Sequence, residues 1–118
     1  MNKVIAKNRE HLKKLIDEAI EELGPNCDLN FIDVSHVKDM NHMFADNDFN
    51  GDISQWDVSN VVDMNWMFAE SKFNGDISEW NVSNVKDMNR MFRGSKIPSI
   101  VQTKLEHKNK ENRFGYRY

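Results

Sequence analysis

The residues with the clearest potential for chemistry are aspartates that recur every 24 positions. They fall into two columns, the first Asp28, Asp52 and Asp76, the second Asp39, Asp63 and Asp87. Aligned carboxylates are suitable ligands for Ca²⁺. The alternative is structural: the first column would follow a glycine turn, and the second would lie in the opening turn of a predicted short helix, where acids interact favourably with the helix dipole. We expect the structural role, with no metal and no cofactor.

The other reactive side chains form no catalytic arrangement. The histidines are His11, His36, His42 and His107. Only His36 and His42 are close, and a spacing of six does not place two side chains on one helical face. Metalloprotease, Cys-x-x-Cys and phosphate-binding glycine motifs are missing from the sequence. Cys27 takes the position that Gly51 and Gly75 hold in later repeats, so we expect a small turn residue, not a reactive thiol. The sequence predicts a protein that is not an enzyme.

A 24-residue repeat must position these side chains. Residues 49–68 read Phe-Asn-Gly-Asp-Ile-Ser-Gln-Trp-Asp-Val-Ser-Asn-Val-Val-Asp-Met-Asn-Trp-Met-Phe, and residues 73–92 repeat them with few changes. An earlier, shorter copy ends at Phe44. Such a fixed period is typical of a solenoid. Each copy combines an extended segment, such as residues 52–58, with apolar spacing that suits a helix of about two turns, such as residues 61–68. The predicted fold is an α/β repeat, a short leucine-rich-repeat-like solenoid of three 24-residue strand-plus-short-helix units over residues 27–98.

The two ends of the repeat have different sequences, within what we expect to be a single domain over residues 1–118. Residues 8–24 predict an amphipathic helix with Asn8 as its N-cap and Gly24-Pro25 as its stop. This helix would cover the open apolar end of the solenoid. Residues 99–118 are expected to hold a closing strand or helical turn and then a basic, aromatic tail. Because this end has no convincing cap in the sequence, its edge would be available for pairing, and homodimerisation is a possible outcome.

Charge is distributed unevenly along the chain, whose formal net charge is −3. Residues 27–98 contain six basic and twelve acidic side chains, whereas residues 99–118 contain five basic and two acidic ones. An acidic repeat body disfavours direct binding of nucleic acid, which requires clustered lysine and arginine. The single cysteine allows no intrachain disulfide, and the sequence has no signal peptide and no apolar run long enough to span a membrane. We therefore expect a cytoplasmic protein that does not engage a membrane.

The repeated string Phe-Asn-Gly-Asp-Ile-Ser-x-Trp-(Asp/Asn)-Val-Ser-Asn-Val-x-Asp-Met-x-x-Met-Phe resembles the BspA-like bacterial leucine-rich repeat, also known as the mycoplasma lipoprotein-associated repeat. The resemblance covers residues 29–92. It implies a leucine-rich-repeat fold and a role in binding other proteins, since members of that family are mostly surface proteins that bind host or neighbouring proteins. One alternative that it implies is a fragment or relative of bacterial surface adhesins.

Positions that vary between the copies are the candidates for partner binding. His42, Trp66 and Arg90 occupy one such position. Either they form an exposed binding hot spot, or Trp66 covers a gap between repeats. A second set would line the open face of the extended segments and make it acidic. Its members are Asp33, Gln55, Asp57 and Glu79. In the aromatic tail, Tyr116 and Tyr118 are further candidates.

These observations favour a non-catalytic protein-protein interaction module that binds its partner through the exposed solenoid face. An acidic face suits a partner with a basic surface. The alternative is a small acidic inhibitor, of the kind that mobile genetic elements encode, which blocks a nucleic-acid-binding protein.

Overall fold

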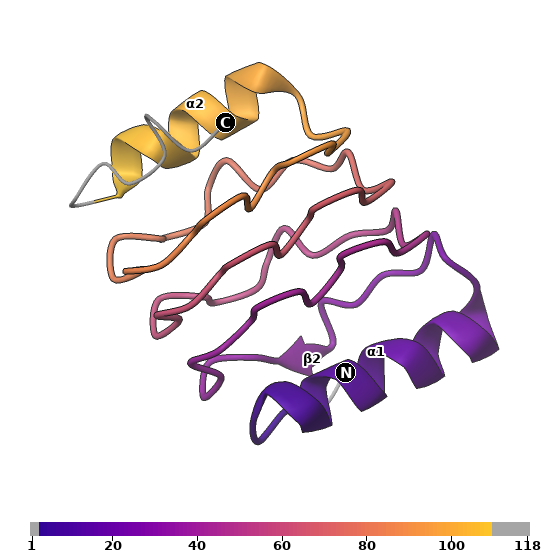
Figure 1. The fold of residues 1–118 in the computed structure, drawn as a ribbon. Coiled ribbons are helices and arrows are strands. Elements are labelled where there is room, and N and C mark those ends of the chain that lie inside the picture. The colour runs from indigo at the N-terminus through magenta and orange to yellow at the C-terminus, as the bar shows by residue number, and fades with distance from the viewer. Residues whose placement is uncertain (1–2, 110–118) are drawn as a thin grey trace.

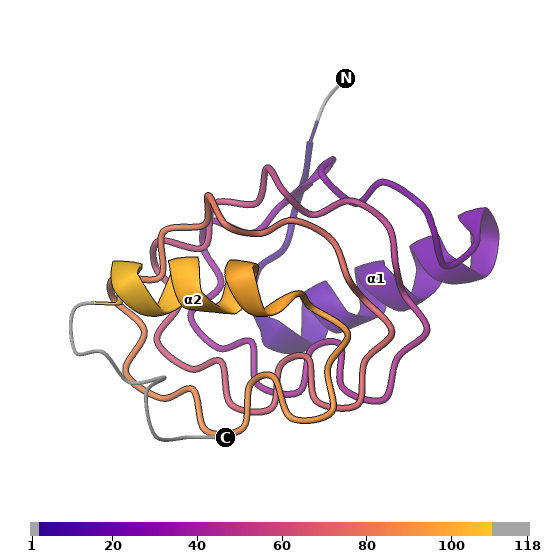
Figure 2. The ribbon, with the colours of Figure 1, turned by 90° about the horizontal axis from the view of Figure 1, so that it is seen from above.

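The computed structural model describes residues 3–109 of the chain. Its elements, in order, are strand β1 (Val4–Ile5), helix α1 (Arg9–Leu23), strand β2 (Ile32–Asp33) and helix α2 (Ser99–Lys108). The two helices lie at opposite ends of the molecule, and the turns of residues 34–98 form layers between them (Figure 1). Viewed at right angles, these layers are superposed loops around a common interior (Figure 2). Together they make a compact globule with a buried aromatic cluster.

Helix α1 confirms the helix predicted over residues 8–24. The side-chain oxygen of Asn8 accepts a hydrogen bond from the backbone N–H of His11 at 2.9 Å, which satisfies one of the donors left open at a helix start. The helix ends at Leu23, and its C-cap is Gly24, whose φ of 91° is one that other residues rarely adopt. Leu12 and Ile16 are fully buried in the core. The helix therefore covers the apolar interior at this end, as its sequence pattern predicts.

Strand β1 was not predicted from the sequence. It pairs in parallel with β2, Val4 opposite Ile32 and Ile5 opposite Asp33. Two residues are too short for a recognisable alternation of apolar and polar side chains, so only the tertiary structure identifies this strand.

Equivalent residues of neighbouring copies lie one above another. The rings of Phe44 and Phe68 are stacked with centroids 5.7 Å apart, and those of Trp56 and Trp80 with centroids 6.3 Å apart. The indole N–H of Trp80 donates to the Ile53 carbonyl oxygen at 3.1 Å. Backbone bridges with the same 24-residue offset join the second aspartate column from member to member. The buried core is thus built from columns of identical side chains, which the 24-residue spacing predicts.

The predicted strand of each repeat copy is present only in the first copy, as β2, and the predicted short helices are not found in the described residues. Within residues 34–98, the structure has turns and isolated bridges, but no strand or helix. The reason lies in the hydrogen bonds: His42, in the predicted helix of the first copy, donates its N–H to Asn65 of the next copy at 2.9 Å. Its φ of 58° is also incompatible with a right-handed helix. Contacts between copies therefore override the local helical spacing.

Helix α2 closes the other end of the molecule, where the sequence left open a strand or a helical turn. Its residues Val101 and Leu105 are buried in the core. Beyond the helix, the side-chain amide of Asn109 donates to the carbonyl oxygens of Val82 and Val85, at 3.0 Å each. Pairing with a second copy was expected because the sequence shows no convincing cap at this end, and α2 covers the apolar core there. Neither helix in the described part of the chain is long and apolar enough to cross a membrane.

Candidate functional site

The three variable residues His42, Trp66 and Arg90 form a stack on the surface. The rings of His42 and Trp66 are nearly parallel, at 8°, with centroids 5.8 Å apart. From the following copy, the guanidinium carbon of Arg90 lies 5.5 Å from the centre of the Trp66 ring, and that of Arg93 lies 5.9 Å from it. We call these four residues the Trp66 row. His42, Arg90 and Arg93 are exposed, whereas Trp66 is half-buried beneath its neighbours. Trp66 therefore lies at the surface and also packs between side chains of the neighbouring copies.

The backbone of the row adopts an unusual conformation. The φ angles of His42, Trp66 and Arg90 are 58°, 56° and 53°. This left-handed region costs a residue with a side chain about 1 kcal/mol or more, and a bulky residue such as tryptophan is uncommon there. Four positions later in each copy, the chain is left-handed again, and there the last copy has a glycine, Gly94. The row instead places three large side chains at strained positions.

Alternate backbone N–H groups of the stacked turns point toward the following copy. In residues 40–46, alternate N–H groups all donate to the next copy: Met40 to Asp63, His42 to Asn65, Phe44 to Met67 and Asp46 to Ala69. The same pattern joins residues 64–70 to residues 87–93. His42 and Asp46 are left-handed and lie four positions apart, and a chain that combines right- and left-handed residues can turn its N–H groups toward one side. The stacked turns therefore present N–H groups at the α2 end of the molecule and carbonyl oxygens at the α1 end.

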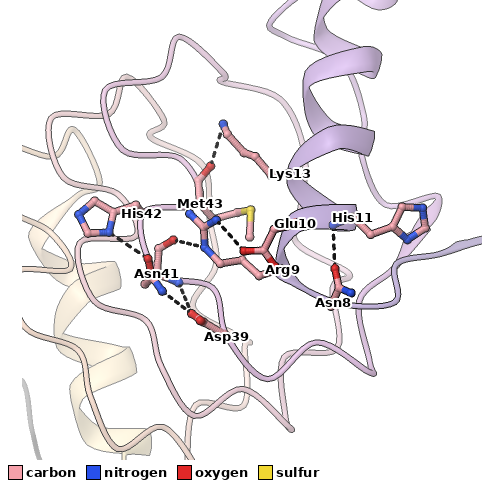
Figure 3. A network of polar contacts seen from close by, with 9 residues as sticks. All are labelled: Asn8, Arg9, Glu10, His11, Lys13, Asp39, Asn41, His42 and Met43. Atoms are coloured by element: carbon pink, nitrogen blue, oxygen red, sulfur yellow. Dashed lines mark hydrogen bonds and ion pairs between the residues drawn. The ribbon is translucent and has the colours of Figure 1, made fainter.

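Side chains of α1 cover the carbonyl end (Figure 3). Arg9 donates from Nε to the carbonyl oxygen of Asn41 at 2.8 Å, and Lys13 donates from Nζ to that of Met43 at 3.3 Å. In the next copy, the corresponding carbonyls accept from backbone N–H groups instead. Two cations thus supply the donors that a preceding copy would have supplied. This role cannot be predicted from the sequence, because a lysine or arginine on the polar face of an amphipathic helix ordinarily faces solvent.

The second set of predicted residues lies at the surface, with Gln55, Asp57 and Glu79 exposed and Asp33 half-buried. The Asp57 carboxylate accepts hydrogen bonds from the hydroxyl and the N–H of Ser59, at 2.6 and 3.0 Å. These bonds lower the pKa of Asp57, and equivalent bonds from a serine two residues on lower the pKa of Asp33. Both carboxylates therefore remain ionised well below neutral pH. Tyr116 and Tyr118 lie outside the described residues.

The second aspartate column has a turn geometry, not the predicted place in a helix. Asp39 accepts from the N–H of Asn41, and Asp63 accepts from that of Asn65, both at 2.9 Å. Burial, together with the carboxylates of the copies on either side, raises the pKa of Asp63. Within residues 3–109, no group of three or more acidic, histidine or cysteine side chains is arranged to hold a metal ion.

Cys27 is a half-buried free thiol, and burial raises its pKa, which disfavours the reactive thiolate. A Cβ atom at Gly51 would lie 1.7 Å from the carbonyl oxygen of Cys27. The two residues are therefore in close backbone contact at the turn where the sequence predicts a small residue.

Comparison with known proteins places the chain in a family. No curated protein and no solved structure is similar enough to count as a match. One family model matches residues 10–112, which is most of the chain. The chain belongs to the family described as Mycoplasma protein of unknown function, DUF285.

Proposed function

We propose that the protein is a short leucine-rich-repeat-like solenoid, related to the BspA-like repeats, that works as a non-catalytic protein-protein interaction module. Its partner would bind across the Trp66 row. One basis is the series of hydrogen bonds and stacked rings that join equivalent parts of successive copies. The other is that equivalent positions hold the same residue type in the core and different residue types at the surface. Solenoids use their extended surfaces to bind other molecules.

The observation that carries the proposal is the strained backbone under three large side chains at the surface, of which Trp66 is half-buried. At the three left-handed positions of the row, glycine would avoid the strain. The chain has histidine, tryptophan and arginine there, and the stacking of these side chains offsets only part of the cost, at about 0.5 to 1.5 kcal/mol for each contact. Strained backbone that persists under functional side chains is a recognised feature of binding sites. Tryptophan and arginine are also the residues most enriched at binding hot spots.

The acidic face made by Asp33, Gln55, Asp57 and Glu79 would add a second contact to a basic surface of the partner. The two aspartates are ionised at neutral pH, and hydrogen bonds from neighbouring serines lower their pKa further, so their charge is available for steering such a partner. The same observation favours the second candidate function, a small acidic inhibitor that occupies the basic cleft of a nucleic-acid-binding protein. Displacement of DNA from a captured partner, in a manner that depends on salt, would distinguish this inhibitor from an ordinary interaction module.

Affinity capture tests the proposal. The tagged protein would be used in extracts of cells that naturally encode it, and captured proteins would be identified by mass spectrometry and then purified for binding measurements. We expect Trp66→Ala to weaken binding of the purified partner by tenfold or more, as hot-spot truncations do. Ile100→Ala is the matched control, because Ile100 is an exposed apolar residue on α2 and is not part of the row. Equal binding by the two variants would contradict the proposal.

A further inference from the structure

The last copy of the repeat presents backbone donors that have no acceptor in the described chain. In the copy before it, the N–H groups of Trp66 and Glu70 donate to carbonyl oxygens of the last copy, at 3.0 and 2.7 Å. The equivalent N–H groups of the last copy belong to Arg90 and Gly94, and within residues 3–109 no oxygen accepts from them. Both residues are exposed and left-handed, with φ of 53° and 65°. N–H groups in such turns form acceptor-binding concavities.

Two guanidinium groups lie beside these donors. Arg90 and Arg93 both contact the Trp66 ring, and neither forms an ion pair with any residue in the described range. A guanidinium that contacts a ring keeps its N–H groups in its own plane, where two of them can bind one carboxylate. The carboxylate of Glu70 also lies near the edge, with its oxygens 2.5 Å from the point where a Cβ at Gly94 would be. The edge therefore combines two backbone N–H donors and two guanidinium groups with the carboxylate of Glu70.

The opposite end of the molecule shows what such an edge requires. There, the unpaired carbonyl oxygens of the first copy are met by the cations Arg9 and Lys13. By the same electrostatic logic, the N–H edge requires an anionic group that also supplies acceptors. A second copy of the chain cannot supply them by head-to-tail stacking, because α1 already covers its carbonyl end.

We propose that the edge formed by the N–H groups of Arg90 and Gly94 and the guanidinium groups of Arg90 and Arg93 binds an extended acidic segment of a partner protein. Backbone carbonyls of that segment accept from the two N–H groups, as in the addition of a strand to an open edge, and its carboxylates pair with the arginines. This inference rests on the proposed function and specifies the chemistry of the partner.

Charge favours an acidic peptide segment at this edge over residues 110–118 of the chain itself and over a nucleic acid. Residues 110–118 contain three basic side chains and one acidic one, so they would bring positive charge to an edge that is already positive. A nucleic acid has the required negative charge, but its phosphate backbone would run beside a repeat body with twice as many acidic as basic residues. A short peptide with few carboxylates meets the arginines without that repulsion.

The test uses the full chain and a fluorescein-labelled nonapeptide of alternating valine and glutamate, with binding followed by anisotropy at low ionic strength. The same peptide with glutamine or lysine in place of glutamate serves as the control. We expect only the glutamate peptide to bind. Backbone NMR should show that the amides of Arg90 and Gly94 shift and become protected from hydrogen exchange when it is added.

Protein variants locate the site. Arg90→Gln combined with Arg93→Gln should weaken binding by about tenfold or more, since hydrogen bonds between charged groups are lost. Lys7→Gln combined with Lys14→Gln removes the same charge from exposed positions at the α1 end, opposite α2, and should leave binding within about twofold. Glu70→Gln removes the nearby competing carboxylate and should strengthen binding. Melting curves of all variants separate loss of binding from loss of the fold.

Several outcomes would overturn the inference. It fails if the glutamate peptide binds no more tightly than its controls, or if the two double variants weaken binding equally. It also fails if the amides of Arg90 and Gly94 are already protected from hydrogen exchange in the free protein, whether or not that protection increases with protein concentration. Tighter binding of single-stranded oligothymidylate than of the peptide would favour nucleic acid instead. If the captured partner requires Trp66 but is indifferent to the arginine pair, the inference fails while the proposed function stands.

Discussion

Replacing Trp80 with phenylalanine tests whether the aromatic columns hold the copies together. Trp80 is buried, its ring stacks on that of Trp56, and its indole N–H donates to the carbonyl oxygen of Ile53 at 3.1 Å. The change removes that hydrogen bond, worth about 1 kcal/mol net, since the carbonyl keeps a backbone bond at 3.2 Å. It also leaves a cavity of roughly 40 Å³, worth about 1 kcal/mol, and weakens the stacking by about 0.5 kcal/mol. The expected loss is about 2 to 3 kcal/mol in the free energy of unfolding, a large part of a typical domain's total.

Urea denaturation followed by circular dichroism measures this loss, with Trp66→Phe as the matched control. The control removes the same atoms from a half-buried ring whose N–H makes no hydrogen bond within residues 3–109. We expect it to lower the free energy of unfolding by less than about 1 kcal/mol. The reasoning is refuted if Trp80→Phe unfolds within about 0.5 kcal/mol of the native protein, or if the control is at least as destabilised.

Three further changes test other parts of the structure. Gly51→Ala should destabilise the fold by about 3 kcal/mol or prevent folding, because the new Cβ would lie 1.7 Å from the carbonyl oxygen of Cys27. A melting temperature close to that of the native protein would contradict this contact. Arg9→Met keeps the apolar stem but removes the donor at the carbonyl end. Urea titration should show that the free energy of unfolding falls by about 1 to 2 kcal/mol. The control Lys14→Met, on the exposed face of α1, should lower it by less than about 0.5 kcal/mol. Asp63→Asn should stabilise the protein at pH 7, because burial and neighbouring carboxylates raise the pKa of Asp63 and make its ionised form unfavourable in the folded state. Thermal melts should show that advantage shrinking as the pH falls through the raised pKa and vanishing below the usual value of 3.8, whereas an advantage independent of pH would exclude the electrostatic explanation.

Local patterns in the sequence were sufficient to predict those features of the fold that depend only on the spacing of residues. The apolar stripe and its Asn8 cap predict α1 to within a residue at each end, and the repeat predicts that Trp56 lies over Trp80. In the candidate site, the same repeat brings His42, Trp66 and Arg90 together. These predictions succeed because identical side chains at a fixed interval can bury their apolar surface together only when they superpose.

The backbone between the columns could not be predicted in this way. Spacing by three and four residues indicates a helix, yet Trp66 adopts a left-handed conformation that its own propensity disfavours. Hydrogen bonds to the next copy and stacking on His42 offset the strain, and neither contact is visible in a local window of sequence. Arg93 was missed for the same reason, since only the folded chain brings its guanidinium over the Trp66 ring.

The sequence by itself determined which residues superpose, which face of the first helix is buried, and which positions vary from copy to copy. Only the tertiary structure decided the direction of the turns, with carbonyl oxygens meeting Arg9 and Lys13 at one end and N–H groups left at the other. The physical reason is that a repeat fixes the distance between equivalent residues, whereas the handedness of each residue depends on hydrogen bonds that form only once the copies are stacked.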